Sequence, residues 1–273
     1  MRQLPRDPRF VISGAFLLVL IFISLFGQQV APYPADLVDA AQQLKGPQPG
    51  HLLGTDEFGR DILTRLILGT RLTMLVSLGS VILATVVGTA LGVLAGYFRR
   101  WTELLSMRLV DVIVSFPPLL LAVFVITFLG PTLENLIITI GVLFVPRYAR
   151  VAHVVTLAAK EREYVEAART IGARTWRIVS RAILPNVVAP LIVQFSLGMG
   201  TAVLTESSLS FLGLGPPPPA ASWGRSIQQS ARFMALNPYV VIWPSLMISI
   251  TVLALNVIGD SLRDALDPRL RML

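Results

Sequence analysis

The sequence of 273 residues has no cysteine and only two histidines, His51 and His153. Without thiols the chain cannot form disulfide bonds, perform thiol catalysis or hold a metal through cysteine. The two histidines lie far apart in the sequence, and a lone histidine is more often structural than catalytic. The sequence therefore predicts neither a thiol site nor a metal site.

The usual motifs of catalytic and nucleotide-binding sites are missing as well. No G-x-x-x-x-G-K-[ST] loop occurs, so the chain is not expected to bind a nucleotide through a P-loop. The G-x-S-x-G and H-E-x-x-H patterns are absent too. Ser207 and Ser208 stand beside Glu206, but no base accompanies them. We expect a protein that is not an enzyme and binds no cofactor of its own.

Charged residues are scarce. They make up 14% of the chain, against about 25% in a typical soluble domain. Hydrophobic residues make up 54%, and the mean hydropathy is +0.70. The net charge of +7 would also suit a nucleic-acid partner, but the basic residues are scattered between apolar segments, as the positive-inside rule describes. The composition therefore indicates a membrane protein and no nucleic acid.

Six apolar segments are long enough, alone or with their flanks, to cross a hydrocarbon core of about 30 Å. They are residues 10–30, 72–98, 112–133, 135–157, 187–205 and 238–259. The first follows Arg2, Arg6 and Arg9 but is too long for a signal peptide, so we interpret it as an uncleaved span. Pro117 and Pro118 predict a kink in the third. The expected fold is all-α and polytopic, with six transmembrane helices.

The chain is expected to divide into two regions. Residues 1–71 would hold the first span and an outward-facing loop, and residues 72–273 a five-helix core with a cytoplasmic loop at about 158–186. In the second span Gly88, Gly92 and Gly96 recur at a spacing of four. Small residues at that spacing let two helix backbones approach closely in lipid, so this face is predicted to pack against another helix.

The distribution of basic residues predicts the orientation. Seventeen of the 23 Lys and Arg residues lie in the N-terminal segment, the turn near Arg99, the stretch 147–181 and the C-terminal tail. The other six lie in the two proline-containing loops, 31–71 and 206–237. By the positive-inside rule the first group is cytoplasmic. Both termini are then expected in the cytoplasm and the two loops outside.

Ionisable side chains are nearly absent from the predicted spans, where a charge costs about 2.5 to 3.5 kcal/mol. Only Glu134 and Glu206 come close, each at the outer end of a span. This scarcity argues against an ion-coupled carrier, which normally keeps a buried carboxylate. Three polar residues of the fifth span and its end, Glu206, Ser207 and Gln194, are candidates for a translocation path.

The polar stretch 163–186 separates two apolar segments and has the pattern of a helix, a break and a second helix. Gly172 stands where a helix end favours a residue that adopts positive φ. Thr175 is expected to cap a second short helix, which would end before Pro185. Helices this short are marginal alone in water, so this stretch needs a partner.

This stretch resembles the EAA motif of ABC importer permeases, the inner-membrane subunits of binding-protein-dependent transport systems. The residues that match are Glu166-Ala167-Ala168, Gly172 and Leu184-Pro185. The outer loops resemble the second, C-type permease subunit of the dipeptide, oligopeptide and nickel group, with LGTD at 53–56, GRD at 59–61, SFLGLG at 210–215 and SWG at 222–224. The tail, with GDSLRD at 259–264 and DPR at 267–269, fits as well. Ala182 departs from the family, which often has a larger side chain there.

The resemblance covers nearly the whole chain and implies the type I ABC importer permease fold with a cytoplasmic coupling helix that lies in a groove of an ATPase subunit. The residues implied in ATPase coupling are Glu163, Glu166, Ala167, Ala168, Gly172, Leu184 and Pro185. Those implied in docking of a binding protein are Asp56, Arg60, Asp61, Gly213, Gly215 and Trp223. The loop residues would equally suit a purely structural role in turns and at the membrane interface.

The resemblance also implies partners. These are a homologous permease subunit in a heterodimer, two P-loop ATPase subunits that bind ATP and Mg, and an extracytoplasmic solute-binding protein, in a bacterial or archaeal inner membrane. Di- or oligopeptides are the expected substrates, and nickel, glutathione-like peptides and opine-type solutes stay open. Two other classes are a self-contained carrier, which needs an essential charge in a span, and a structural membrane subunit, which needs no path.

Overall fold

The computed structural model describes residues 7–34 and 37–266, which fold mostly into helices. The long helices are α1 (Pro8–Val30), α2 (Ile62–Phe98), α5 (Leu133–Lys160), α8 (Leu184–Phe211) and α10 (Tyr239–Leu266). The short ones are α3 (Trp101–Val114), α4 (Pro118–Leu129), α6 (Glu163–Thr170), α7 (Thr175–Ile178) and α9 (Trp223–Ser230), with turns η2 (Ala40–Gln42), η3 (Val179–Ile183) and η4 (Ala231–Phe233). The predicted tail motif at 267–269 lies outside the described residues, as do Arg2 and Arg6.

Five helices of the described part are long and apolar enough to cross a membrane, and the bent pair α3–α4 would make a sixth. This agrees with the predicted all-α, polytopic class. Helix α2 has 37 residues, so it is about 55 Å long and exceeds the hydrocarbon core. The predicted span 72–98 is the apolar part of this longer helix. The boundary predicted at residue 71 falls within this helix.

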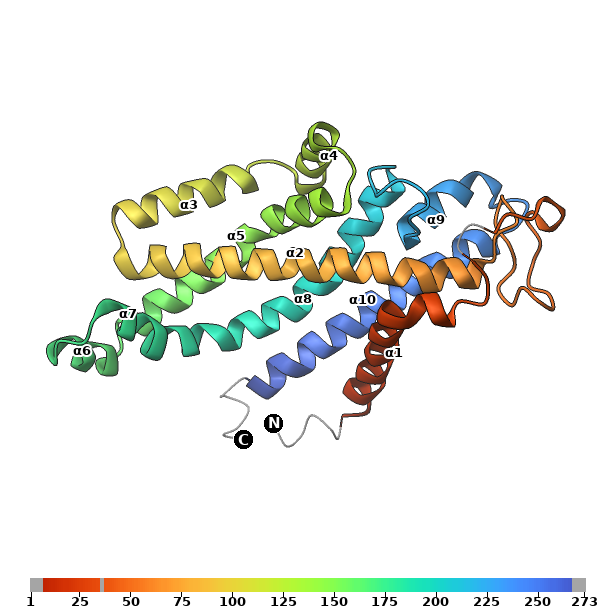
Figure 1. Ribbon diagram of the computed structural model, residues 1–273. Coiled ribbons are helices and arrows are strands. Elements are labelled where there is room, and N and C mark those ends of the chain that lie inside the picture. The colour runs from red at the N-terminus through yellow and green to blue at the C-terminus, as the bar shows by residue number, and fades with distance from the viewer. Residues whose placement is uncertain (1–6, 35–36, 267–273) are drawn as a thin grey trace.

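Helices α5, α8 and α10 run obliquely alongside α2, α1 is more steeply inclined, and the two polar parts of the chain lie at opposite ends of the bundle (Figure 1). Helix α2 packs against α5, α8 and α1, and α10 packs against α8 and α1. Helices α6 and α7 lie at one end of α2, whereas α9 and the loop before α2 lie at the other. The predicted coupling stretch and the predicted docking loops are thus separated by the full length of the bundle.

The third predicted span is two helices and not one kinked helix. Helices α3 and α4 meet at an angle of 90°. Pro117 is the N-cap of α4 and Pro118 begins it, so the break falls where the proline pair predicted it, since proline cannot continue the preceding helix. The predicted start at residue 112 is wrong because α3 begins at Trp101. Leu105 and Phe128 on this pair are exposed, as expected for side chains that face lipid.

The predicted glycine face of α2 packs against α5. A Cβ on Gly92 would lie 2.3 Å from the carbonyl oxygen of Ala149, and one on Gly96 would lie 2.8 Å from Cβ of Thr156. A Cβ on Gly88 would lie 2.7 Å from Cβ of Tyr148. All three positions exclude a larger side chain, so the close approach predicted from the spacing is confirmed.

Candidate functional site: the helical hairpin at one end of the bundle

The break between α6 and α7 is built by Gly172 as a Schellman motif. The amide of Ala173 donates to the carbonyl of Ala168 at 3.0 Å, and the amide of Gly172 donates to that of Arg169 at 2.9 Å. Gly172 has φ of +75°, which a side chain would disfavour. The predicted helix stop is therefore confirmed in position and in conformation.

The second half of this stretch differs from the prediction. Thr175 is the first residue of α7, and the N-cap is Arg174, which makes no side-chain capping bond. The helix does not end before Pro185, because α7 passes through η3 into α8 without a break. The amide of Leu184 bonds to the carbonyl of Val179 in this π-helical turn. Such a turn shifts the backbone hydrogen bonds by one residue just before Pro185, which has no amide hydrogen to donate.

Helix α6 is anchored by one buried side chain and by contacts to α2 and α8. Val165 is fully buried, whereas Tyr164 on the same helix is exposed. The side-chain amide of Asn186, at the start of α8, donates to the hydroxyl of Tyr164 at 3.1 Å. The guanidinium of Arg169 lies over the ring of Tyr97, near the end of α2, at 5.6 Å from its centroid. Helix α6 is thus in direct contact with two long helices.

The junction of α2 and α5 strengthens this anchorage. The ammonium of Lys160 donates to the carbonyl oxygen of Tyr97 and lies 5.3 Å from the centre of its ring. Arg99 and Glu161 form an ion pair at 3.4 Å, which is exposed and contributes little alone. The residues that hold α6, namely Tyr97, Lys160 and Asn186, were not predicted as site residues. Of these three residues, only Asn186 could have been found from the sequence, since it directly follows the Leu184-Pro185 pair that matches the family motif.

The predicted coupling residues fall into an exposed and a packed group. Exposed positions are Glu163, Glu166, Ala167 and Gly172. Both carboxylates lie in the first turn of α6, where negative charge interacts favourably with the helix dipole. Ala168 is half-buried and packs on the core. Two further residues, Leu184 and Pro185, are exposed at the start of α8. The helix thus offers a small, acidic surface around Glu166 while its other side is fixed to the bundle.

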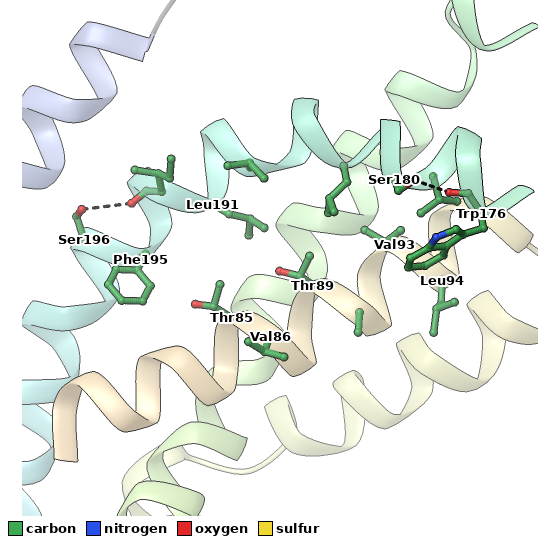
Figure 2. A pocket seen from close by; sticks show the side chains of 15 residues that line it. Thr85, Val86, Thr89, Val93, Leu94, Trp176, Ser180, Leu191, Phe195 and Ser196 are labelled. Atoms are coloured by element: carbon green, nitrogen blue, oxygen red, sulfur yellow. Dashed lines mark hydrogen bonds between the residues drawn. The ribbon is translucent and has the colours of Figure 1, made fainter. Parts of the chain in front are cut away.

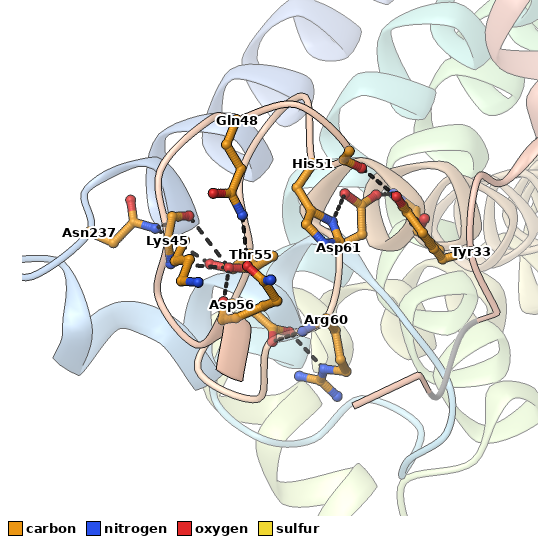
Figure 3. A network of polar contacts seen from close by, with 12 residues as sticks. Tyr33, Lys45, Gln48, His51, Thr55, Asp56, Arg60, Asp61 and Asn237 are labelled. Atoms are coloured by element: carbon orange, nitrogen blue, oxygen red, sulfur yellow. Dashed lines mark hydrogen bonds and ion pairs between the residues drawn. The ribbon is translucent and has the colours of Figure 1, made fainter. Parts of the chain in front are cut away.

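The outer loop at the opposite end is fixed by a buried polar network (Figure 3). Asp56 accepts from the backbone amides of Phe58 and Arg60, both at 2.9 Å, and from Nε of Arg60 at 2.7 Å. Asp61 caps α2 by accepting from the amide of Thr64 at 2.7 Å, and its other oxygen lies 3.1 Å from Nδ1 of His51. Both carboxylates are nearly fully buried, so they hold the loop from within, and their part in docking remains a prediction.

Short helix α9 folds over the outer end of α2. Trp223 is completely buried, and its indole nitrogen donates to the carbonyl of Leu66 at 3.0 Å. Ser230 donates to the carboxylate of Glu57 at 2.6 Å. Partial burial lowers the pKa of the Arg225 guanidinium from its ordinary value, and the charge of nearby Arg60 lowers it further. Trp223 therefore lies in the interior of the subunit, and its part in docking of a binding protein remains a prediction.

The glycines of the SFLGLG segment form the end of α8. The amide of Leu214 donates to the carbonyl of Leu209 at 2.9 Å, and that of Gly213 to Ser210 at 3.1 Å. Gly213 has φ of +83° and is exposed. Gly215 is buried, and a Cβ there would lie 2.3 Å from Oγ of Ser210. Gly213 thus forms a second Schellman motif at the end of α8 and is exposed, whereas Gly215 is packed against Ser210; their part in docking remains a prediction.

Glu206 lies inside the described bundle and not in a loop. Helix α8 extends to Phe211, and Glu206 is completely buried. One carboxylate oxygen accepts from Ser210 at 2.7 Å and the other from Ser207 at 3.4 Å. Glu206 and Ser207 are therefore packed between helices of this subunit, and their role in a path remains a prediction. Gln194 is only half-buried, and its role in a path remains a prediction.

The fold and the two polar ends define a multi-pass membrane subunit with an anchored helical hairpin at one end, the architecture of a membrane permease. Residues 88–272 match the family described as binding-protein-dependent transport system inner membrane component, and residues 1–47 match the N-terminal transmembrane domain of oligopeptide transport permease C. The chain belongs to the first of these families, the permeases of ABC importers. It is a transport subunit and not an enzyme, and it works with ATPase and substrate-binding partners.

Full-length relatives agree. The chain is 41% identical to a glutathione transport system permease protein of Pectobacterium atrosepticum, over 99% of this chain and 90% of the relative. It is 38% identical to a dipeptide transport system permease protein of Alkalihalophilus pseudofirmus, over 99% and 89%. It is 42% identical to a di/tripeptide transport system permease protein of Pseudomonas aeruginosa, over 94% and 86%.

A solved structure shares the fold. It is the inward-facing MetNI methionine ABC transporter, which matches with a TM-score of 0.60 at 22% identity, over 76% of this chain and 96% of that one. At this identity the likeness concerns the fold alone. The type I permease fold expected from the resemblance is thus shown.

Proposed function

We propose that the chain is one half of the translocation path of an ATP-driven peptide importer and that α6 transmits movement from an ATPase subunit. One observation carries this proposal. Helix α6 exposes Glu163, Glu166 and Ala167 while it is tied to α8 through Tyr164 and to α2 through Arg169. A partner that moves this exposed surface would therefore move two long helices.

The coupling role is tested by charge reversal at Glu166. In the complete transporter, Glu166→Lys is expected to lower uptake per ATP hydrolysed at least about tenfold, because it opposes the helix dipole and reverses the charge of the docking surface. Membrane insertion should be unchanged. Asp264→Lys, an exposed charge reversal on α10, is the control. Normal uptake per ATP in Glu166→Lys would contradict the proposal.

The anchorage is tested separately by Tyr164→Phe, which removes the hydroxyl bonded to Asn186 and keeps the ring. We expect the ATPase subunits to stay bound, since the exposed face of α6 is unchanged, while ATP hydrolysis responds more weakly to the binding protein and its ligand. Co-purification and the stimulated ATPase rate measure the two effects. Equal stimulation in wild type and variant would remove Tyr164 from the transmission path.

The proposed assembly contains a second, homologous permease subunit, two ATPase subunits and an extracytoplasmic solute-binding protein. ATP and Mg are proposed to bind to the ATPase subunits, so no cofactor is proposed for this chain. Both termini and α6 are proposed to face the cytoplasm, since most basic residues lie on that side. The proposed location is the bacterial or archaeal inner membrane.

The binding protein is proposed to dock on the exposed surface of the outer end. Leu52 and Phe58 of the loop before α2 and Leu212 after α8 are exposed large apolar side chains there, while Arg60 lies against the ring of Phe58 at 4.5 Å. Leu52→Asp should keep basal ATPase activity and lower its stimulation by the binding protein. An unchanged stimulation curve would leave the loop with a structural role only.

Peptides are the proposed substrates. Support comes from the relatives, whose names specify glutathione, dipeptides and di- or tripeptides; glutathione is itself a peptide. Ligand identification by mass spectrometry on the binding protein that co-purifies with this chain tests the proposal. A bound metal ion or a non-peptide solute would contradict it.

A further inference from the structure

An open groove of about 680 Å³ runs between α2 and the continuous helix formed by α7, η3 and α8 (Figure 2). Its walls are apolar, with Val86 and Leu94 from α2 and Leu191 and Phe195 from α8. The indole of Trp176 closes the end nearest the hairpin and is 78% exposed. The large aromatic surface of Trp176 is therefore uncovered at this end of the groove.

The hydroxyl groups in the groove wall are mostly occupied by their own helices. Thr85 donates to the carbonyl of Val81 at 2.7 Å, Ser180 to that of Trp176 at 2.8 Å, and Ser196 to that of Ile192 at 3.2 Å. A peptide carries an amide donor and acceptor at nearly every residue and needs partners for them when buried. This groove offers few, so it is suited to a hydrocarbon chain and not to a peptide in transit.

A second open cavity, of about 770 Å³, lies on the other side of Trp176 and is basic. Arg174, Arg177 and Arg181 line it at helical spacing, and each is exposed. Among the described residues, none of the three guanidinium groups forms an ion pair or a hydrogen bond from its side chain. Three adjacent cations without partners favour an anionic ligand, and guanidinium groups suit phosphate.

On α2 the groove follows about 14 Å of helix axis, from Thr85 to Leu94, and on the continuous helix of α7, η3 and α8 it follows about 30 Å, from Trp176 to Ser196. The acyl chain of a lipid in one leaflet, which covers about half of a hydrocarbon core of about 30 Å, fits within this length. Tryptophan prefers the boundary between acyl chains and headgroups, which is where Trp176 separates the apolar groove from the basic cavity.

We infer that the two cavities together bind one anionic phospholipid of the cytoplasmic leaflet. One acyl chain lies in the groove between α2 and α8, and the phosphate headgroup lies among Arg174, Arg177 and Arg181. The inference rests on the orientation proposed above. Because this lipid would contact α7 directly after the coupling hairpin, it would support the position of that hairpin at the membrane surface.

The test measures contact between lipid and Trp176 in the assembled transporter. The transporter is placed in nanodiscs of phosphatidylcholine that contain phosphatidylglycerol with brominated acyl chains, which quench nearby indoles. Subtracting the emission of a Trp176→Phe transporter isolates the Trp176 signal. We expect strong quenching by brominated phosphatidylglycerol and at least about fivefold weaker quenching, at equal mole fraction, by brominated phosphatidylcholine.

The headgroup contribution is tested with Arg177→Gln combined with Arg181→Gln. Each basic side chain at an anionic surface contributes about 1 kcal/mol, a factor of about five, so the double variant should lose most of the preference for phosphatidylglycerol. Arg108→Gln, an exposed arginine of α3 outside both cavities, is the control and should keep it. These substitutions are at exposed positions, so they are not expected to impair folding.

Three results would overturn the inference. Quenching without preference between the two lipids would mean ordinary lipid exposure. Absence of quenching would mean that another subunit covers the groove. A preference that survives in the double arginine variant would place the headgroup elsewhere. Failure of the coupling role would be distinguishable, since an uncoupled Glu166→Lys transporter should keep the full preference for phosphatidylglycerol.

Discussion

Single buried side chains at the outer end hold together elements that are distant in sequence. Trp223 joins α9 to α2 through the carbonyl of Leu66, which also accepts from the hydroxyl of Thr70 at 2.9 Å. Glu206 gathers hydroxyls of α8 around a carboxylate that no described cation contacts. Asp56 arranges the loop before α2. Each acts by packing and hydrogen bonding inside the subunit.

Trp223→Ala is predicted to destabilise the subunit by about 3 kcal/mol or more, because it removes a fully buried aromatic side chain and leaves a cavity. Trp223→Phe should cost only about 1 kcal/mol, since Leu66 keeps the bond from Thr70. The thermal unfolding midpoint in detergent measures both. Trp101→Ala is the control, because Trp101 is 81% exposed. A Trp223→Ala protein as stable as wild type that fails only to respond to the binding protein would support direct docking.

The residues found from the sequence are those fixed by local rules. Gly172 was predictable because a helix stop needs positive φ near one particular position. Asn186 and Tyr97 were not, because their roles depend on contacts with residues 22 and 72 positions away in the chain. Glu206 was misplaced for a similar reason. Its charge suggested the end of a span, but seryl hydroxyls one residue and one turn along the helix satisfy it in the interior.

At the scale of whole elements, the bundle is organised around the pairing of α2 with α5. Its register is fixed by backbone contact at Gly92 and Gly96, where larger side chains have no room. In lipid, such close packing replaces the hydrophobic effect as the source of helix association. Periodicity predicted this contact, whereas the right-angled bend between α3 and α4 did not follow from the prolines alone, because its angle depends on what each helix packs against.

Gly92→Val is predicted to be among the most damaging substitutions in α2. Its Cβ would lie 2.3 Å from a backbone oxygen, so α2 and α5 must separate, at a cost of about 1–3 kcal/mol or more. Gly14→Ala is the matched control, since nothing lies within 4 Å of a Cβ there and alanine favours a helix over glycine by about 0.5–1 kcal/mol. Equal unfolding midpoints for the two variants would contradict this packing.

At the scale of the whole molecule, the chain separates a polar, anchored end from a hairpin end that is exposed to a partner (Figure 1). The carboxylates of the outer end, Trp223 and α9 are all bonded within the subunit. In the coupling role proposed for α6, helices α2 and α8 would carry its movement, because each of them reaches from the hairpin towards the outer loops.

The opposite placement of the two ends gives a direct prediction of topology. Because the chain has no cysteine, a single introduced one is a unique label site in this subunit. Leu52→Cys, at a position 71% exposed, should react with a membrane-impermeant maleimide applied to spheroplasts. Thr170→Cys, on the exposed side of α6, should react only after the membrane is permeabilised. Labelling of both sites from the outside would contradict the orientation inferred from the basic residues, and with it the docking of α6 on a cytoplasmic ATPase.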